Sequence, residues 1–367
     1  MKSSAAVILA AGYSSRAQQF KPLLKIGNET VVDRVISLFF NNSNDVFLVT
    51  GWRQDELISN LHYSDIRIVQ NPDYAGGMFT SIKAGIRALK PYHERFFIMP
   101  VDIPLVRPFT IKYLEECSLL APGKIVYPIF RGQRGHPPLI PISLVSEILN
   151  SPDNEGLKII LDAHEKDSLD IAVPDQYIHC DMDTPEDYNL ILKRYSDYET
   201  PTTEEAEIIR RDIIRILPAI RKHCDKVAEI AQIIGNRLQK KGFKLNLGLI
   251  VAASLLHDIA KGQPNHEAAG AALLSSMGFG RIGDVVARHT DLPEAADVSL
   301  EDKIVYLSDK LVIEDQIVFL EERFQTTEQR FAGNPEAKAQ IARRRQQALS
   351  IQSELENILG DSLNSII

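Results

Sequence analysis

The sequence predicts two units of different fold class, an α/β unit with a mostly parallel sheet followed by an all-α unit. Three observations lead to this prediction. Up to about residue 195, short apolar runs alternate with amphipathic stretches, the pattern of parallel strands covered by helices on both faces. The polar stretch RYSDYETPTTEEAE, residues 194–207, interrupts this rhythm, and its Thr202–Glu205 spacing fits a capping box. Beyond it, segments with helical spacing follow one another with almost no strand pattern.

Bulk composition narrows the class of protein. The 367 residues suffice for two ordinary domains, and 44% apolar and 25% charged residues are typical of a globular chain. The net charge of −8 argues against a nucleic-acid partner, because such binders present a basic face. Three cysteines without metal-type spacing suit a reducing cytoplasm. The first apolar run is too short to span a membrane and lacks a signal-peptide ending, so we expect a cytoplasmic protein without membrane association.

The predicted strands of the first unit are rich in Val, Ile, Phe or Tyr and end in turn residues. They are AAVILAA (5–11), DVFLVTG (45–51), IRIVQ (66–70), RFFIMPVD (95–102) and KIVYPIF (124–130). Helical spacing is found between them in TVVDRVISLFF (30–40), DELISNLH (55–62) and SIKAGIRALK (81–90). Ligands of such folds bind beyond the carboxyl ends of the strands, so residues at strand ends are the first candidates for a site.

The first predicted strand leads into LAAGYSSRAQQFK, residues 9–21, which is neither a P-loop nor a Gly-x-Gly-x-x-Gly loop. Ala10, Ala11 and Gly12 allow the backbone close to a ligand, and successive N–H groups form an anion nest. Arg16 and Lys21 can add positive charge at a polyphosphate. The alternative is a plain strand-to-helix turn with exposed basic residues.

Three further segments favour a nucleotide site over that alternative. Asp102 follows the apolar strand RFFIMPV, where a carboxylate suits a Mg²⁺ ion that bridges phosphates. GGMFTSIKAG (76–85) places Ser81 at a helix start, a position suited to anion or base contact. DMDTPEDY (181–188) offers two carboxylates, one of which could be a second metal ligand. Each segment could instead be a simple helix cap.

Five ordered motifs resemble those of the MobA-like nucleotidyltransferases, above all the molybdenum cofactor cytidylyltransferases, over residues 1–195. The motifs are LAAGYSSRAQQFKPLL, GGMFTSIKAG, MPVDIP, RGQRGHPPLI and DMDTPEDY. The resemblance implies a Rossmann-like, glycosyltransferase-A-like fold. It also implies that nucleophilic attack of an acceptor phosphate on the α-phosphate of a nucleoside triphosphate releases pyrophosphate.

The resemblance assigns roles to residues of these motifs. Catalytic roles would fall to Arg16, Lys21 and Asp102. Nucleotide contacts would come from Leu9, Ala10, Ala11, Gly12, Ser14, Ser15, Gly77 and Ser81. Asp102 would bind Mg²⁺ with Asp181, or alternatively Asp183, and the acceptor would meet Gly135, His136 and Pro137. The family's Arg-Met-Gly is replaced here by Arg16-Ala17-Gln18, which leaves the nucleotide preference open.

The second unit is predicted to be helical throughout. The expected helices are residues 211–242, LGLIVAASLLHDIAKG (247–262), NHEAAGAALLSSMG (265–278), IGDVVARHT (282–290) and residues 299–324. A further charged stretch at 335–358 is expected to be a solvated helix.

Four side chains on three of these helices could converge on one divalent metal ion: His223, His257, Asp258 and Asp309. Imidazole and carboxylate ligands together suit Mn²⁺, Fe or Zn²⁺ better than Mg²⁺. His223 alone could be a surface residue and His257 a core histidine. Two aspartates beside apolar residues favour the metal site, because a buried carboxylate needs a partner.

The order His, His-Asp, Asp resembles the HD superfamily of metal-dependent phosphohydrolases, over roughly residues 206–320. That resemblance implies an all-α HD domain in which a metal-activated water attacks a phosphate. Lys261 would neutralise the substrate, and His266 and His289 would bind phosphate or a second metal, as in a subset that hydrolyses nucleotides.

Together these features predict an enzyme with three segments, a transferase domain at 1–198, an HD domain at 199–330 and a helical tail at 331–367. The expected substrates are a nucleoside triphosphate, with CTP preferred, and a molybdopterin-type phosphate destined for a molybdenum hydroxylase. The HD domain is expected to hydrolyse a nucleotide or phosphoester. Two alternatives stay open: transfer to a sugar or alcohol phosphate, and a non-catalytic nucleotide or cofactor carrier with a structural HD domain.

Overall fold

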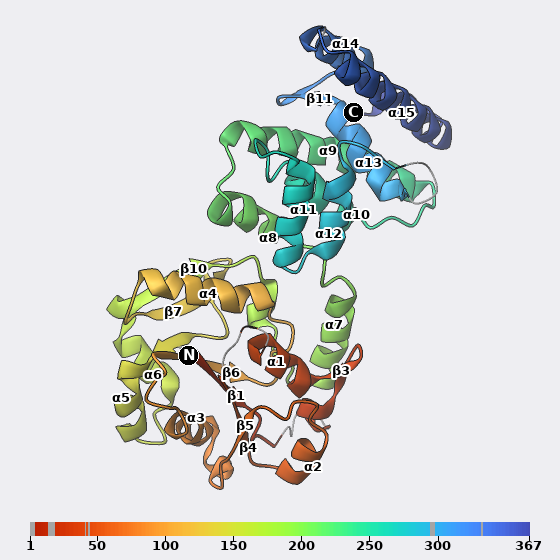
Figure 1. Cartoon of the computed structure of the whole chain (residues 1–367). Coiled ribbons are helices and arrows are strands. Elements are labelled where there is room, and N and C mark those ends of the chain that lie inside the picture. Colours follow the sequence, from red (N-terminus) through yellow and green to blue (C-terminus); the bar gives the residue numbers. More distant parts are fainter. Residues whose placement is uncertain (1–3, 14–18, 41, 43–44, 294–297, 332) are drawn as a thin grey trace. The chain divides into compact units, whose positions relative to one another are not determined.

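The computed structural model describes residues 4–13, 19–40, 42, 45–293, 298–331 and 333–367 (Figure 1). The chain divides into two compact units, Met1–Asp197 and Tyr198–Ile367. Among the described residues, every helix is too short or too polar to span a lipid bilayer.

The first unit is built on one eight-stranded sheet in the order β10-β7-β9-β6-β1-β4-β5, with β8 paired to β7. Its strands are β1 (Ser4–Leu9), β4 (Asp45–Thr50), β5 (Arg67–Gln70), β6 (Arg95–Pro100), β7 (Ile125–Phe130), β8 (Gln133–Arg134), β9 (Leu139–Pro141) and β10 (Ser168–Ala172). β1 lies parallel to both β4 and β6, which confirms the mostly parallel sheet. β9 runs antiparallel between β6 and β7, and its three residues were too few to show a strand period.

Helices cover both faces of this sheet (Figure 1). They are α1 (Val31–Phe40), α2 (Gln54–Ser59), α3 (Met78–Arg87), α4 (Pro108–Leu120), α5 (Val145–Asn150), α6 (Leu157–Ala163) and α7 (Pro185–Ser196). On one face, Val7 and Phe47 share a buried cluster with Ile82 of α3 and Ile148 of α5. On the other face, α1 packs on β1 and β4, and α4 on β7. A short hairpin, β2 (Lys25–Ile26) with β3 (Glu29–Thr30), precedes α1.

In its described residues, the second unit is helical apart from one small hairpin. Its helices are α8 (Thr203–Ile208), α9 (Pro218–Lys240), α10 (Leu247–Leu256), α11 (His266–Ser276), α12 (Gly280–Arg288), α13 (Leu300–Lys310), α14 (Leu320–Arg330), α15 (Pro335–Leu359) and α16 (Leu363–Ile366), with a π-helical turn at Ile209–Ile213. The hairpin is β11 (Val312–Ile313) with β12 (Gln316–Ile317). The Thr202–Glu205 capping box forms as expected.

Two expected helices are interrupted. The stretch 211–242 breaks before Pro218, which starts α9, because proline fits the first turn of a helix but not its interior. The stretch 299–324 breaks at the β11–β12 hairpin, whose turn holds Glu314 at φ 55°. The helix at 335–358 is not solvated on all sides. α15 buries a stripe that includes Ile341, Ile351 and Leu355, and it packs on α13 and α14.

Candidate functional site

A cavity of about 340 Å³ opens where β1 and β6 end at the carboxyl edge of the sheet. It collects residues that lie far apart in the sequence. Its lining includes most of the residues predicted to contact the nucleotide, namely Leu9, Ala10, Ala11, Gly12, Gly77 and Ser81, and two predicted catalytic residues, Lys21 and Asp102. Ser14, Ser15 and Arg16 lie outside the described residues.

The backbone after β1 is held in place by both neighbouring strands. The Ala10 N–H donates to the Val49 carbonyl at 2.9 Å, and the Val101 N–H donates to the Leu9 carbonyl at 3.1 Å. The side chains of Ala10 and Ala11 are buried, whereas Gly12 is exposed and has open space where a Cβ would be. The loop therefore presents its backbone at Gly12 directly to the cavity.

Lys21 lies between two carboxylates at this cavity. Its Nζ is 2.7 Å from Asp183 Oδ1 and 3.4 Å from Asp102 Oδ2, and its side chain is only 9% exposed. Burial raises the pKa of Asp102, while the Lys21 ammonium opposes that shift. Two carboxylates that face one cation form an oxygen donor set of the kind that Mg²⁺ prefers, so these residues fit that ion.

The carboxylate beside Asp102 is Asp183, the alternative considered in the sequence, whereas Asp181 is exposed and does not line the cavity. Asp183 is positioned by the start of α7. The Asp187 carboxylate accepts hydrogen bonds from the N–H groups of Asp183 at 3.1 Å and Thr184 at 2.8 Å, within a capping box. The helix cap that was considered as an alternative function for this segment is therefore present. The same cap holds the Asp183 carboxylate at the cavity.

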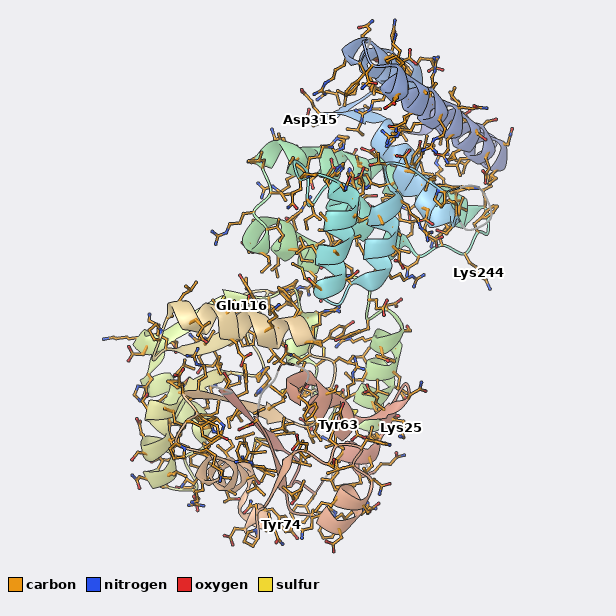
Figure 2. All side chains as sticks on the ribbon, in the orientation of Figure 1. Lys25, Tyr63, Tyr74, Glu116, Lys244 and Asp315 are labelled. Carbon is orange, nitrogen blue, oxygen red and sulfur yellow. The ribbon has the colours of Figure 1, made fainter. Side chains whose placement is uncertain are left out.

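The far wall of the cavity is the start of α3. Gly77 precedes this helix at φ 104°, a conformation that favours glycine. The Ser81 hydroxyl accepts a hydrogen bond of 2.9 Å from the buried Asn71 amide. Tyr74, labelled in Figure 2, also lines the cavity and was not anticipated from the sequence.

A second cavity, of about 480 Å³, shares Met78 and Pro100 with the first. It is lined by Gly135 and His136 of the Gly-His-Pro motif, but not by Pro137. Gly135 lies so close to Ile178 that a Cβ would be 2.6 Å from the Ile178 carbonyl oxygen. Burial lowers the pKa of His136, which favours the neutral ring.

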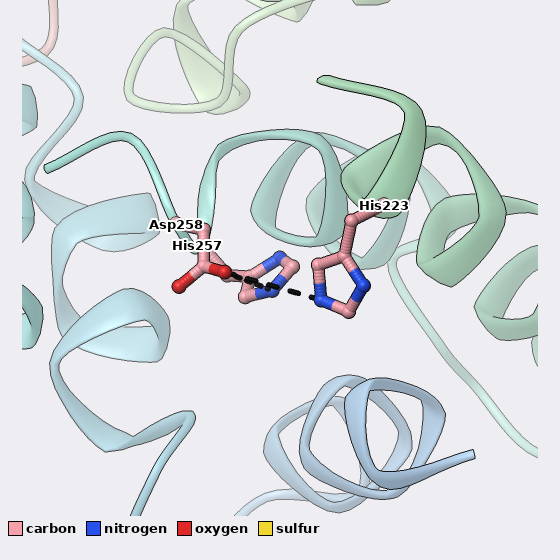
Figure 3. A group of neighbouring side chains, drawn as sticks. All are labelled: His223, His257 and Asp258. Atoms are coloured by element: carbon pink, nitrogen blue, oxygen red, sulfur yellow. Dashed lines mark ion pairs between the residues drawn. The ribbon is translucent and has the colours of Figure 1, made fainter. Parts of the chain in front are cut away.

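The second unit brings the four predicted HD residues together (Figure 3 draws three of them). His223 comes from α9, His257 and Asp258 follow α10, and Asp309 lies in α13. Asp309 Oδ1 is 3.1 Å from His223 Nε2 and 3.5 Å from His257 Nε2. Asp258 Oδ2 is 3.6 Å from His257 Nε2 and 3.9 Å from His223 Nε2.

The hydrogen bonds of the histidine rings determine which nitrogen faces the centre. The Nδ1 atoms of His223, His257 and His289 lie 2.8, 2.8 and 2.7 Å from backbone carbonyl oxygens, which can only accept a hydrogen bond. In the neutral rings, Nε2 therefore carries a lone pair toward the carboxylates.

A nitrogen lone pair and a carboxylate oxygen that face each other repel unless a proton or a cation lies between them. His257 Nε2 and Asp258 Oδ1 are buried and have no hydrogen-bond partner among the described residues. Together with His223, these residues form a donor set in which all ligand atoms lie within 4.8 Å of one another. The arrangement therefore fits a divalent metal ion.

A second donor set, formed by Asp258, His266 and His289, uses Oδ1 of the same aspartate, whereas Oδ2 faces His223 and His257. Asp258 Oδ1 is 3.4 Å from His266 Nε2 and 3.6 Å from His289 Nε2. Lys261 Nζ lies 2.8 Å from Asp258 Oδ2. Lys310, which was not among the predicted site residues, is buried with its Nζ 2.7 Å from Asp309 Oδ2, and its position next to Asp309 in the sequence was the available signal.

The close packing of charged groups in this centre shifts the pKa values of several of its residues. Burial alone would raise the pKa of Asp309, but Lys310 and the histidines hold it well below its usual value. Burial likewise opposes the His257 imidazolium, but Cys224 and Asp309 raise the pKa of His257 well above 6.5. Burial lowers the pKa of His289, so that ring is neutral and able to ligate.

Comparison with known proteins identifies a domain family in each unit. The family model of the MobA-like NTP transferase domain matches residues 6–168, and that of the HD domain matches residues 220–313. The molybdenum cofactor cytidylyltransferase of Escherichia coli is 30% identical over 192 residues, which are 52% of this chain and 96% of that protein.

Other similarities are more distant. A bifunctional IPC transferase and DIPP synthase of Rubrobacter xylanophilus is 29% identical over 120 residues, 31% of this chain and 27% of that protein. The structure of a nucleotidyl transferase from Methanothermobacter has a TM-score of 0.47 and 21% identity, and the match covers 53% of this chain and 97% of that one. The chain belongs to the MobA-like NTP transferase family through its first unit, and it carries an HD domain in its second.

Proposed function

We propose that the first unit transfers a nucleoside monophosphate from a triphosphate, CTP first, to a molybdopterin-type phosphate and releases pyrophosphate. The observation that carries this proposal is the cavity at the strand ends, where the 9–12 backbone, Lys21, Asp102 and Asp183 meet. The E. coli relative, whose name includes a cytidylyltransferase activity on molybdenum cofactor, supports CTP and this acceptor.

The chain's own groups would act mainly by positioning and by stabilising charge. An acceptor oxygen forms a bond to the α-phosphorus, and the bond to the β-phosphate oxygen breaks as pyrophosphate leaves. Lys21 and the N–H groups near Gly12 would neutralise charge on the phosphates, with Arg16 added from the sequence. Asp102 and Asp183 would hold Mg²⁺, which polarises the phosphate oxygens when bound. The adjoining cavity with Gly135 and His136 would receive the acceptor.

We propose that the HD domain hydrolyses a nucleotide or another phosphoester. His223, His257, Asp258 and Asp309 would hold Mn²⁺, Fe or Zn²⁺, which activates a water when bound. Lys261 would neutralise substrate phosphate, and the second donor set of Asp258, His266 and His289 supports a second metal or a phosphate contact.

We also infer domain limits of 1–198, 199–330 and 331–367, a cytoplasmic location and delivery of product to a molybdenum hydroxylase. The three free cysteines support a reducing compartment. Delivery of product to a molybdenum hydroxylase rests on the proposed transfer reaction.

One experiment tests the transfer reaction directly. CTP, GTP and ATP are each incubated with Mg²⁺ and with either reduced molybdopterin or a sugar or alcohol phosphate, and pyrophosphate release is measured. Release with CTP above the other triphosphates supports the proposal. Release only with a sugar or alcohol phosphate acceptor supports the runner-up activity, and tight nucleotide binding without release supports a carrier.

A further inference from the structure

A third cavity, of about 730 Å³, lies beside the HD centre and includes His223, Asp258 and Lys261 in its lining. Its other walls come from the start of α9, the turn of the β11–β12 hairpin and α14. Asp315, labelled in Figure 2, marks that hairpin turn. The volume is in the range of sites for nucleotide-sized ligands and is far larger than one phosphate group needs.

Positive charge gathers at this cavity, and Asp315 supplies a partial counter-charge to Lys222, whose ammonium helps the hydrogen bond from Gln316 to lower the pKa of that carboxyl. Lys222, Arg323 and Arg330 all line it, and within the described residues none of the three has a carboxylate at ion-pair distance. Lys222 and Arg330 are exposed, so both are accessible to a ligand. Glu314 and Asp315 are the acidic members of the lining besides Asp258, which faces the histidines.

The hairpin also takes part in the construction of the metal centre. The Glu314 carbonyl accepts the hydrogen bond from His223 Nδ1 at 2.8 Å, and Glu314 adopts φ 55° to present it. Arg323 of α14 donates to the Val312 carbonyl at 3.0 Å and so ties the hairpin to α14. Residues 314–330 lie beyond the 220–313 segment that the HD family model matches.

We propose that the segment 314–330 completes the HD centre as a binding site for a chain of linked phosphates, such as the polyphosphate of a nucleotide. Arg330, Lys222 and Arg323 hold phosphates of the chain beyond the one that Lys261 contacts, and the Glu314 carbonyl orients His223. This inference rests on the proposed phosphohydrolase function and names its substrate class.

Binding of inorganic tripolyphosphate to the full chain with Mn²⁺ tests the proposal by calorimetry. All variants carry Lys21→Ala, so that differences between them report on the HD cavity. Arg330→Ala and Lys222→Ala should each weaken tripolyphosphate binding about tenfold, because each removes a charge-assisted contact. They should weaken orthophosphate binding much less, and Arg330→Lys should restore most of the loss.

Arg281→Ala is the matched control, an exposed arginine of α12 that does not line the cavity, and it should bind like the parent. Equal binding of tripolyphosphate by Arg330→Ala, Lys222→Ala and Arg281→Ala would overturn the inference, whatever the hydrolytic activity. If the cavity variants lose binding while the parent chain hydrolyses no phosphoester, the binding site stands and only the proposed hydrolysis fails. Thermal unfolding of each variant verifies that it is folded.

Discussion

Charged side chains at both sites are buried among groups that nearly neutralise them. Lys21 lies between Asp102 and Asp183 in the first unit, while Asp258 and Asp309 face histidine nitrogens in the second. Isolated buried charge is costly, so such groups persist where they are paired or bind ligands. Single substitutions of these residues should therefore change activity or ligand binding, and a separate measurement of folding can show that the variant is still folded.

Lys21→Ala and Asp102→Ala should each reduce pyrophosphate release by ~100-fold or more, because each removes a group that offsets charge on the phosphates. Steady-state kinetics measures the effect, and circular dichroism verifies the fold. Lys25→Ala, at an exposed lysine labelled in Figure 2, should leave the rate unchanged. Full release by Asp102→Ala would contradict the metal assignment.

Gly12→Ala should change substrate binding, whereas Gly51→Ala should change the stability of the fold. A Cβ at Gly12 meets nothing within 4 Å, so the protein should keep its stability while KM for the triphosphate rises. A Cβ at Gly51 would lie 2.8 Å from Tyr74, so overpacking should cost about 1–3 kcal/mol. Chemical denaturation and KM measurements distinguish the two. An unchanged KM in Gly12→Ala would mean that the ligand does not approach this backbone.

Metal affinity at the HD centre should increase as pH rises above 6.5. The pKa of His257 is raised well above that value, so the metal-free ring is protonated there and must lose its proton to ligate. Titrations with Mn²⁺ in buffers of different ionisation enthalpy should detect proton release on binding. Affinity that is flat across this window would contradict the role of His257 as a ligand.

The β11–β12 hairpin is the element that contributes most to the second site without supplying a ligand. Its turn residue Glu314 adopts a left-handed conformation at φ 55°, which is costly for a residue with a side chain unless its surroundings require it. The carbonyl that this conformation presents accepts the hydrogen bond from His223, so we expect the conformation of the turn to set the orientation of that ring.

Glu314→Pro should lower metal affinity about 10- to 100-fold, because proline cannot adopt the positive φ that presents the carbonyl to His223. Glu314→Gly accepts that φ and should retain the parent affinity. Competition with a chromophoric chelator measures both. Equal affinity of the two variants would show that the turn does not orient His223.

On the scale of the whole molecule, each site draws its described residues from a single unit. The cavity at the strand ends uses residues within Met1–Asp197, and the HD centre uses residues within Tyr198–Ile367. Parallel strands bring their carboxyl ends to one edge, and packed helices bring side chains from distant segments into one core. The two chemistries should therefore be separable in the intact chain.

His257→Ala should lose most of the bound transition metal, because it removes a ligand, yet its pyrophosphate release should stay within about twofold of the parent. Lys21→Ala should show the reverse. Elemental analysis by mass spectrometry and the pyrophosphate assay measure the two properties in the same samples. Loss of transfer activity in a folded His257→Ala variant would contradict this separation.

The sequence by itself determined the two fold classes and the five main strands, and it predicted most of the residues that line the two candidate sites. These features are encoded locally, in runs such as RFFIMPV before Asp102 and in the pair His257-Asp258. The helix-start preference of proline could have placed the beginning of α9 at Pro218, but local patterns could not show that Asp183 rather than Asp181 lines the cavity.

Only the tertiary structure decided which atoms face one another. The His223 tautomer depends on a carbonyl at Glu314, 91 residues away along the chain, and β9 is a strand only because β6 and β7 flank it. Arg323 and Arg330 of α14 line the cavity beside the HD centre because the β11–β12 hairpin reverses the direction of the chain. Such contacts join segments that are distant in sequence, and side-chain periodicity carries no information about them.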